Sequence, residues 1–66
     1  MKVVLYTTHC PQCEVLEKKL KQKNIIFEEI NDITEIRKTG YLTVPLLEVN
    51  GNVMNFKAAI DWVNSI

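Results

Sequence analysis

Residues 3–16 read VVLYTTHCPQCEVL, a segment that holds both an expected strand and the start of an expected helix. A strand is expected over residues 2–6, because a continuous apolar run rich in β-branched residues is typical of a strand buried on both faces. A helix is expected from Pro11, since proline suits the first helical position, where its missing N–H would be unpaired anyway. Cys10 and Cys13 therefore lie at a strand-to-helix junction.

The first helix is expected to run from residue 11 to about residue 23 and to end at Asn24. A second strand is expected over residues 25–30, which are again mostly apolar. Helical spacing predicts that one face of the first helix points into the core. That face is expected to carry Cys13, Val15, Leu16 and Leu20.

A second, short helix is expected after Asp32, whose side chain can cap the helix start. Its inward residues are expected to be Ile33 and Ile36, and Gly40 marks its end. Strands over residues 46–49 and 52–54 are expected to flank Asn50-Gly51, because this dipeptide is the strongest two-residue hairpin signal. Asn55 is expected to cap a last helix. The inward face of that helix is expected to carry Phe56, Ala59, Ile60 and Val63.

The predicted element order is βαβαββα, which indicates an α/β architecture with a four-stranded mixed sheet flanked by three helices. Residues 1–66 are expected to form a single domain, because a chain of this length has room for only one small core. Hydrophobic residues make up 47% and charged residues 24% of the chain, which is ordinary globular composition.

Composition also narrows the function. Eight basic and eight acidic residues give a net charge of zero, whereas a nucleic-acid-binding protein needs a surplus of cations, so we expect no nucleic-acid partner. The N-terminal apolar run is too short for a signal peptide or a membrane span. We therefore expect a cytoplasmic protein, acting as a monomer without membrane contact, in a compartment that keeps thiols reduced.

The chemistry is expected at Cys10-Pro11-Gln12-Cys13, which contains the only two cysteines. A thiol at a helix N-terminus ionises more readily, because unpaired N–H groups and the helix dipole favour negative charge. Cys10 is therefore expected to attack a substrate disulfide, and Cys13, one turn further in and more buried, to resolve the mixed disulfide. Pro11 is expected to stiffen the turn.

Two other interpretations of the cysteines stay open at this point. A structural disulfide is disfavoured, because a separation of three residues closes a loop too small to stabilise the fold much. A closed tetrahedral zinc site needs four protein ligands, and two cysteines with His9 supply three at most, so no such metal site is expected within one chain. Two chains sharing a metal through paired cysteines remain a minor alternative.

Thr43-Val44-Pro45 is the second informative segment, because a proline at the entry to a strand marks an edge, a strand start or a cis bond. Together, the CPxC motif at a helix start, TVP before the third strand and an NG hairpin before the last helix resemble the glutaredoxin branch of the thioredoxin-fold superfamily, over the whole chain. The resemblance implies a thioredoxin-like, glutaredoxin-type fold with Pro45 in cis. It also implies that the backbone of Val44 pairs with an incoming extended chain.

Within that branch, the chain departs from glutathione-dependent glutaredoxins at two places. The loop Thr7-Thr8-His9 lacks a basic residue, and the segment after the hairpin lacks a glycine pair. Gln12, Gly40-Tyr41 and Phe56-Lys57 instead resemble NrdH-type redoxins, although Pro11 is glutaredoxin-like. The resemblance implies substrate-binding roles for Pro11, Gln12, Thr43, Val44, Pro45, Asn55 and Phe56.

The expected function is that of a thiol-disulfide oxidoreductase that reduces protein disulfides through its CPQC dithiol. The similarity to NrdH-type redoxins implies electron donation to ribonucleotide reductase and recharging by thioredoxin reductase and NADPH, with no bound cofactor. One alternative is a glutaredoxin that takes electrons from glutathione and reduces glutathione mixed disulfides. The other is a non-catalytic module of the same fold that binds a metal or a partner.

Overall fold

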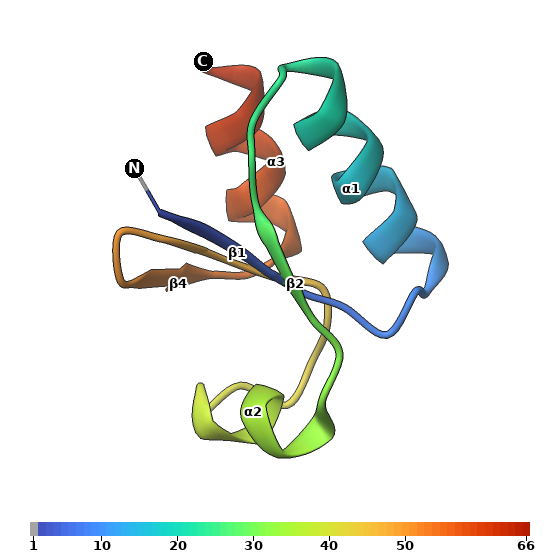
Figure 1. Ribbon diagram of the computed structural model, residues 1–66, viewed down its shortest axis with the longest axis vertical. Coiled ribbons are helices and arrows are strands. Elements are labelled where there is room, and N and C mark those ends of the chain that lie inside the picture. The colour runs from blue at the N-terminus through green and yellow to red at the C-terminus, as the bar shows by residue number, and fades with distance from the viewer. Residues whose placement is uncertain (1) are drawn as a thin grey trace.

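The chain forms one four-stranded mixed sheet with helices on both sides, as the computed structural model shows for residues 2–66 (Figure 1). The strands lie in the order β2-β1-β3-β4. The seven elements are β1 (Val3–Tyr6), α1 (Pro11–Gln22), β2 (Glu28–Ile30), α2 (Ile33–Lys38), β3 (Leu46–Val49), β4 (Asn52–Met54) and α3 (Phe56–Asn64). The predicted βαβαββα order and α/β architecture are confirmed.

Strand pairing follows from the connections. β1 and β2 are joined through α1 and run parallel, with Leu5 opposite Glu29. β3 runs antiparallel to β1, with Leu5 opposite Leu47. The Asn50-Gly51 turn joins β3 to the antiparallel β4, and both turn residues have positive φ (51° and 89°), as a type I′ hairpin requires.

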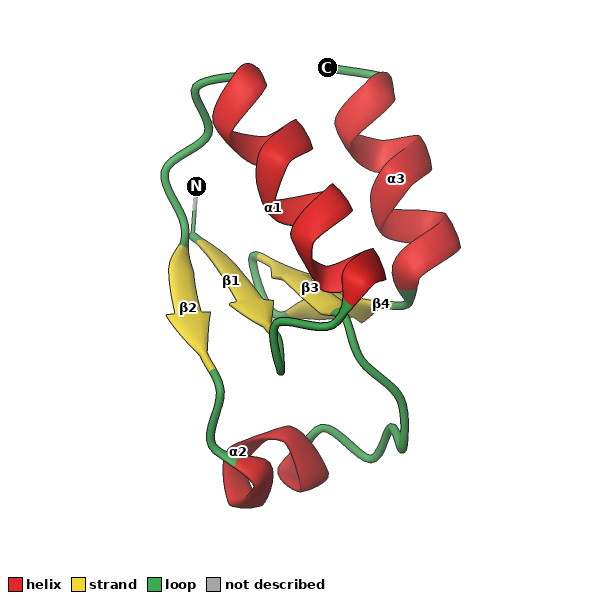
Figure 2. Cartoon of the chain, turned by 90° about the vertical axis from the view of Figure 1, so that its right-hand side faces the viewer, coloured by secondary structure: helices red, strands yellow, loops and turns green. Residues whose placement is uncertain are grey.

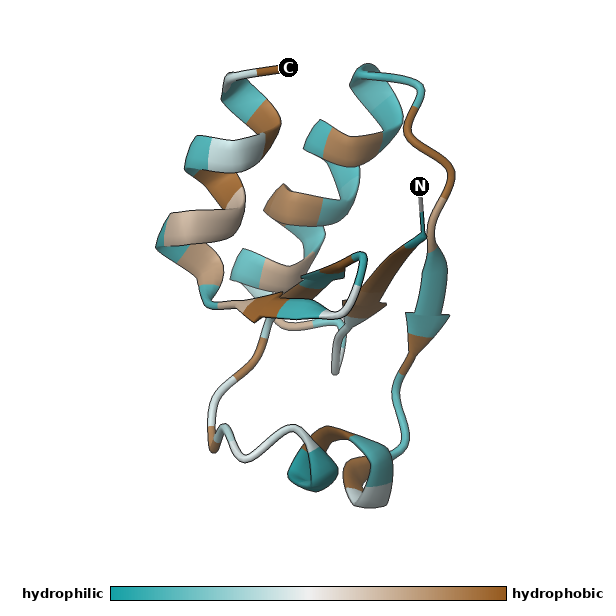
Figure 3. Ribbon diagram, turned by 90° about the vertical axis from the view of Figure 1, so that its left-hand side faces the viewer, coloured by the Kyte–Doolittle hydropathy of each residue, from teal (hydrophilic) through white to brown (hydrophobic). Residues whose placement is uncertain are grey.

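One face of the sheet is covered by α1 and α3, which lie side by side and run in the same direction (Figures 2 and 3). Figure 3 shows apolar ribbon on the sides of both helices that meet the sheet. Alternate residues of the central strands point into this layer, as the period of two in a strand dictates. The buried cluster consists of Val3, Leu5, Leu16, Leu20, Leu47, Val49, Ala59 and Val63.

The opposite face of the sheet is covered by α2 alone (Figure 2). The other alternate residues of the central strands form a smaller buried cluster there. It consists of Val4, Tyr6, Ile36 and Leu46, with Ile30, Val44 and Val53 packed against it. The strand predicted over residues 2–6 is therefore confirmed as buried on both faces for Val3–Tyr6, whereas Lys2 is exposed and lies outside it.

The predicted helix caps form as expected. The side chain of Asp32 accepts a hydrogen bond from the Thr34 amide at 2.8 Å, and that of Asn55 accepts one from the Ala58 amide at 2.9 Å. Each bond satisfies an amide that has no partner within its helix. These two residues fix where α2 and α3 begin.

Three details of the sequence prediction are wrong. The second strand covers only residues 28–30, because the Ile25 amide turns back to the Leu20 carbonyl (3.0 Å) and closes the end of α1 instead of pairing in the sheet. Val15 is 45% exposed, since its position two residues from Cys13 places it outside the buried stripe of α1. Ile33 is 53% exposed, so Ile36 alone anchors α2 in the core.

Among residues 2–66, no helix is both long enough and apolar enough to cross a membrane.

Candidate functional site

The two cysteines lie at the N-terminal end of α1. Cys10 is the N-cap residue, and Cys13, one turn into the helix, is fully buried. Their Cα atoms are 4.9 Å apart and their sulfur atoms lie at disulfide distance. Cys10 keeps partial contact with solvent, so an incoming molecule can reach Cys10 but not Cys13. The expected difference in burial between the two cysteines is confirmed.

The environment of the Cys10 sulfur favours negative charge. The Cys13 amide donates a hydrogen bond to Cys10 Sγ at 3.2 Å, so the sulfur occupies the place of a capping oxygen. The same sulfur lies at the positive end of the dipole of a 12-residue helix. Both effects stabilise a thiolate at Cys10 when the pair is reduced.

Residues 7–10 form the loop that leads into the helix, and Thr7 holds this loop in place. The buried Thr7 donates its amide to the Ile30 carbonyl in β2 at 2.9 Å, and its hydroxyl accepts a hydrogen bond from the His9 amide at 2.9 Å. The backbone of His9 has φ 61°, a left-handed conformation that is uncommon outside glycine. Thr7 thus connects the approach to Cys10 with the sheet.

Pro45 is fully buried, and the Val44–Pro45 peptide bond is cis, as the resemblance implied. Val44 lies two residues before Leu46, which is the first residue of β3 to pair with β1. The backbone of Val44 is therefore outside the ladder between β1 and β3.

A groove lies beside Val44, on the side of the sheet that α2 covers. Its lining comes from the loop before α1, from α2 and from the segment that precedes β3. Leu42 and Tyr41 contribute side chains that are 94% and 41% exposed, and Arg37 contributes a cation. The lining residues are Thr8, Ile33, Ile36, Arg37, Tyr41, Leu42 and Val44.

Of the residues with an implied substrate-binding role, Val44 alone lines this groove. Sequence reasoning did not predict that Thr8, Ile33, Ile36, Arg37 and Leu42 would line a groove. The one available signal was that Leu42 is an apolar residue outside every expected helix and strand. Ile33 gave no such signal, because it was expected to point into the core.

The remaining predicted substrate-binding residues lie outside this lining. Pro11 and Gln12 are exposed in the first turn of α1, and Thr43 is exposed next to Val44. Asn55 caps α3, whose start lies beside the start of α1 (Figure 2). Phe56 is half-buried against the larger core cluster. The substrate-binding roles of all these residues stay predictions.

Tyr6 and Glu48 form a polar pair under the α2 face of the sheet. The Tyr6 hydroxyl donates to Glu48 Oε1 at 3.2 Å. Burial, the negative charge of Glu48 and this hydrogen bond all favour the neutral phenol, and the charge of Glu35 adds to them, so the pKa of Tyr6 is raised above its ordinary value.

Three possible metal ligands also gather near residues 7–10, on the side of the sheet that α1 and α3 cover. His9, Glu17 and Glu29 hold their ligand atoms within 4.8 Å of one another. Neither cysteine is a member of this group.

Comparison with protein-family models, with curated proteins and with solved structures found no match in any of the three.

Proposed function

We propose that the protein is a thiol-disulfide oxidoreductase with a thioredoxin-like fold that reduces disulfides through Cys10 and Cys13. The observation that carries this proposal is the asymmetry of the pair: one sulfur is a partly accessible N-cap and the other is fully buried one turn away. A purely structural disulfide needs no such difference. A disulfide exchange centre does, because one thiol must meet the substrate and the other must be shielded from it.

The reaction proceeds in two exchange steps. The Cys10 thiolate attacks one sulfur of a substrate disulfide, so that a mixed disulfide forms and the other substrate sulfur leaves as a thiolate and takes up a proton. The Cys13 thiolate then attacks Cys10 Sγ and releases the second substrate thiol. The substrate gains two electrons, and the protein loses two as the Cys10–Cys13 disulfide forms.

The substrate lies across Val44 and extends into the groove beside α2. The backbone of Val44 is outside the sheet ladder and is able to pair with an extended chain by strand addition. Leu42 and Tyr41 offer exposed apolar surface next to it. An apolar side chain near the substrate disulfide suits this surface, which favours a protein substrate over a small charged one.

Thioredoxin reductase with NADPH is the proposed electron source, and ribonucleotide reductase the proposed class of electron acceptor, in the cytoplasm. Both follow from the resemblance to NrdH-type redoxins and from the loop Thr7-Thr8-His9, which has no lysine or arginine. Glutathione carries carboxylates at both ends and needs cations to hold them.

One observation favours glutathione as the second candidate. Arg37 lines the groove from α2 and is exposed, so a cation that the loop lacks is present on the opposite wall. A single cation can hold one carboxylate of the tripeptide.

Trapping experiments on two cysteine variants test the proposed roles. Cys13→Ser should attack a disulfide substrate once and stall as a mixed disulfide on Cys10, whereas Cys10→Ser should lose disulfide reduction entirely. Mass spectrometry of the adducts decides the matter. Adducts on Cys13 in the Cys10→Ser protein would reverse the assignment, and failure of both variants to form adducts would favour a non-catalytic module.

The electron source is tested by recharging the oxidised protein with thioredoxin reductase and NADPH or with reduced glutathione. Faster recharging by the reductase is expected. Arg37→Gln should then leave that rate unchanged, with Lys38→Gln as a control that removes the same charge from a neighbouring exposed position. If glutathione recharges the protein faster and Arg37→Gln alone slows it, the glutathione-dependent function is correct.

A further inference from the structure

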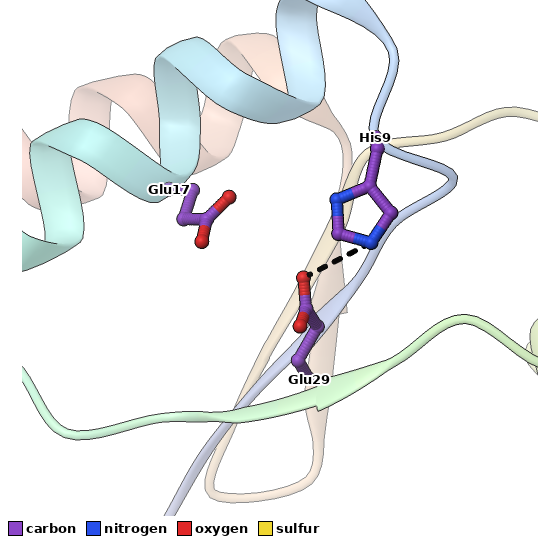
Figure 4. Close-up of side chains that lie close together, drawn as sticks. All are labelled: His9, Glu17 and Glu29. Carbon is purple, nitrogen blue, oxygen red and sulfur yellow. Dashed lines mark ion pairs between the residues drawn. The ribbon is translucent and has the colours of Figure 1, made fainter.

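His9, Glu17 and Glu29 come from three separate segments of the chain and converge on one point (Figure 4). His9 lies in the loop before α1, Glu17 in α1 and Glu29 in β2. In Figure 4 the imidazole ring and the two carboxylates point toward one another. Neither the proposed redox reaction nor the hydrophobic core accounts for this arrangement.

We propose that these three side chains form a binding site for a divalent transition-metal ion of the Zn²⁺ type. The proposal concerns the oxidised as well as the reduced protein and does not depend on the proposed function.

The distances suit such an ion. His9 Nε2 and Glu29 Oε1 are 3.6 Å apart. In a tetrahedral zinc site with bonds of about 2.1 Å, neighbouring ligand atoms are roughly 3.4 Å apart, so these two atoms already span one edge of the tetrahedron. The ligand atoms of all three residues lie within 4.8 Å, so a side-chain movement of about 1 Å brings Glu17 to the same distance.

The backbone holds two of the ligands in place. Thr7 binds β2 through its amide and the His9 amide through its hydroxyl, so the loop that carries His9 is tied to the strand that carries Glu29. Glu29 lies opposite Leu5 in the parallel register, and paired residues share a face of the sheet. Because Leu5 belongs to the core under α1 and α3, the Glu29 side chain is directed to the side on which Glu17 lies.

Burial and charge favour a cation as well. The side chains of Glu17 and Glu29 are only 23% and 37% exposed, so their mutual repulsion is screened less than that of two fully exposed acids. Lys21 pairs with Glu17 Oε1 at 3.1 Å, but a carboxylate has two oxygens and about four acceptor sites, so it can keep this partner and still bind an ion.

The donor set selects the kind of ion. One imidazole nitrogen and two carboxylate oxygens suit zinc and its neighbours, with water as the fourth ligand of the metal. Calcium takes six to eight oxygen ligands, and magnesium needs near-octahedral oxygen coordination, so neither suits a three-residue site that contains histidine.

Zinc titration of the oxidised protein tests the proposal, because its cysteines are then paired and cannot bind metal. Isothermal titration calorimetry should show one Zn²⁺ per chain and no comparable binding of Mg²⁺. His9→Gln, Glu17→Gln and Glu29→Gln should each weaken zinc binding by at least about tenfold, since loss of even an indirect partner of a metal ligand costs that much.

Glu28→Gln is the matched control. It removes the same charge from the adjacent residue of β2, but Glu28 lies opposite Val4 and is directed to the other face of the sheet. Zinc affinity should change less than twofold in this variant. Amide NMR spectra of each variant without metal are expected to show that the fold is retained. In the wild type, the amide shifts that zinc induces should centre on the three ligand residues.

Two results would overturn the proposal. One is that the oxidised protein binds no zinc, or binds it only after reduction of the cysteines. The other is that Glu28→Gln weakens binding as much as Glu29→Gln does, which would mean that zinc responds to overall charge and not to a site.

Discussion

The two faces of the sheet differ in how they are covered. Among residues 2–66, the cluster under α1 and α3 contains eight buried residues, six of which have no exposed surface at all. The face under α2 carries four, and next to them Leu42, Ile33 and Tyr41 remain exposed around a groove. We infer that the first face supplies most of the stability, whereas the second leaves apolar side chains exposed.

The difference in burial between the two faces matters in a chain of only 66 residues. Such a short chain buries only about 60% of the surface that its unfolded form exposes, so an apolar side chain left outside the core is a real cost. Ile33 and Leu42 are left outside on the same side of the sheet as Val44. We infer that these two apolar side chains stay exposed because the proposed substrate binding uses them.

Truncating one leucine on each side of the sheet to alanine tests this difference in stability. It is the prediction with the largest expected effect. Leu16→Ala removes a fully buried side chain from α1 and should lower the free energy of unfolding by about 2–5 kcal/mol. Leu42→Ala removes a side chain that is 94% exposed and should change it by less than about 0.5 kcal/mol. Urea unfolding measures both, and similar losses would contradict the assignment of stability to the α1 and α3 face.

A second matched pair lies within α2. Ile36 is 6% exposed and Ile33 is 53% exposed, although both were expected to point inward. Ile36→Ala should cost about 2 kcal/mol, near the lower end for buried isoleucine because the cluster under α2 is small, and Ile33→Ala should cost well under 1 kcal/mol. Equal destabilisation by the two variants would contradict the difference in burial between Ile36 and Ile33.

The groove is tested by activity instead of stability. Leu42→Ala should lower kcat/KM for a protein disulfide roughly three- to tenfold, which corresponds to the loss of part of a buried leucine contact in the complex. Val15→Ala is the control, because Val15 is also exposed but lies on α1 and outside the groove lining. Equal rates for Leu42→Ala and the wild type would show that substrates do not use this surface.

The smallest expected effect concerns Tyr6 under the α2 face. Its pKa is raised by burial and by Glu48, so the phenol keeps its proton in the folded protein at a pH where the unfolded chain loses it. The stabilisation is therefore fully present below the pKa of the unfolded tyrosine and is lost as the pH rises through the folded pKa. Ultraviolet titration of a Tyr41→Phe protein follows Tyr6 alone, and Glu48→Gln should lower its pKa.

A Tyr6 that titrates at or below the ordinary tyrosine pKa would contradict the described burial and its pairing with Glu48.

Local sequence patterns predicted most of the fold. The apolar run before Thr7, the caps at Asp32 and Asn55 and the Asn50-Gly51 turn all act over a few residues, and all appear as expected. The second strand was predicted too long, because its first residues look like a strand while the Ile25 amide is used to end α1. Competition between a helix end and a strand start is not visible in a hydrophobic pattern.

The candidate site was predictable only in part. The cysteine pair follows from one short motif at a helix start, so its placement and the difference in burial were correct. The groove and the group of His9, Glu17 and Glu29 each join segments that are distant in sequence. No local rule says that Arg37 and Thr8, or Glu17 and Glu29, share a surface, because that depends on how the layers are assembled.

The most direct test of the central claim is a single-turnover transfer from the reduced protein to a protein disulfide, without any reductase present. The predicted result is that each chain reduces one substrate disulfide and ends with Cys10 and Cys13 joined, as thiol counting and mass spectrometry would show. Cysteines that remain reduced while the substrate disulfide stays intact, under conditions in which dithiothreitol reduces it, would contradict the claim.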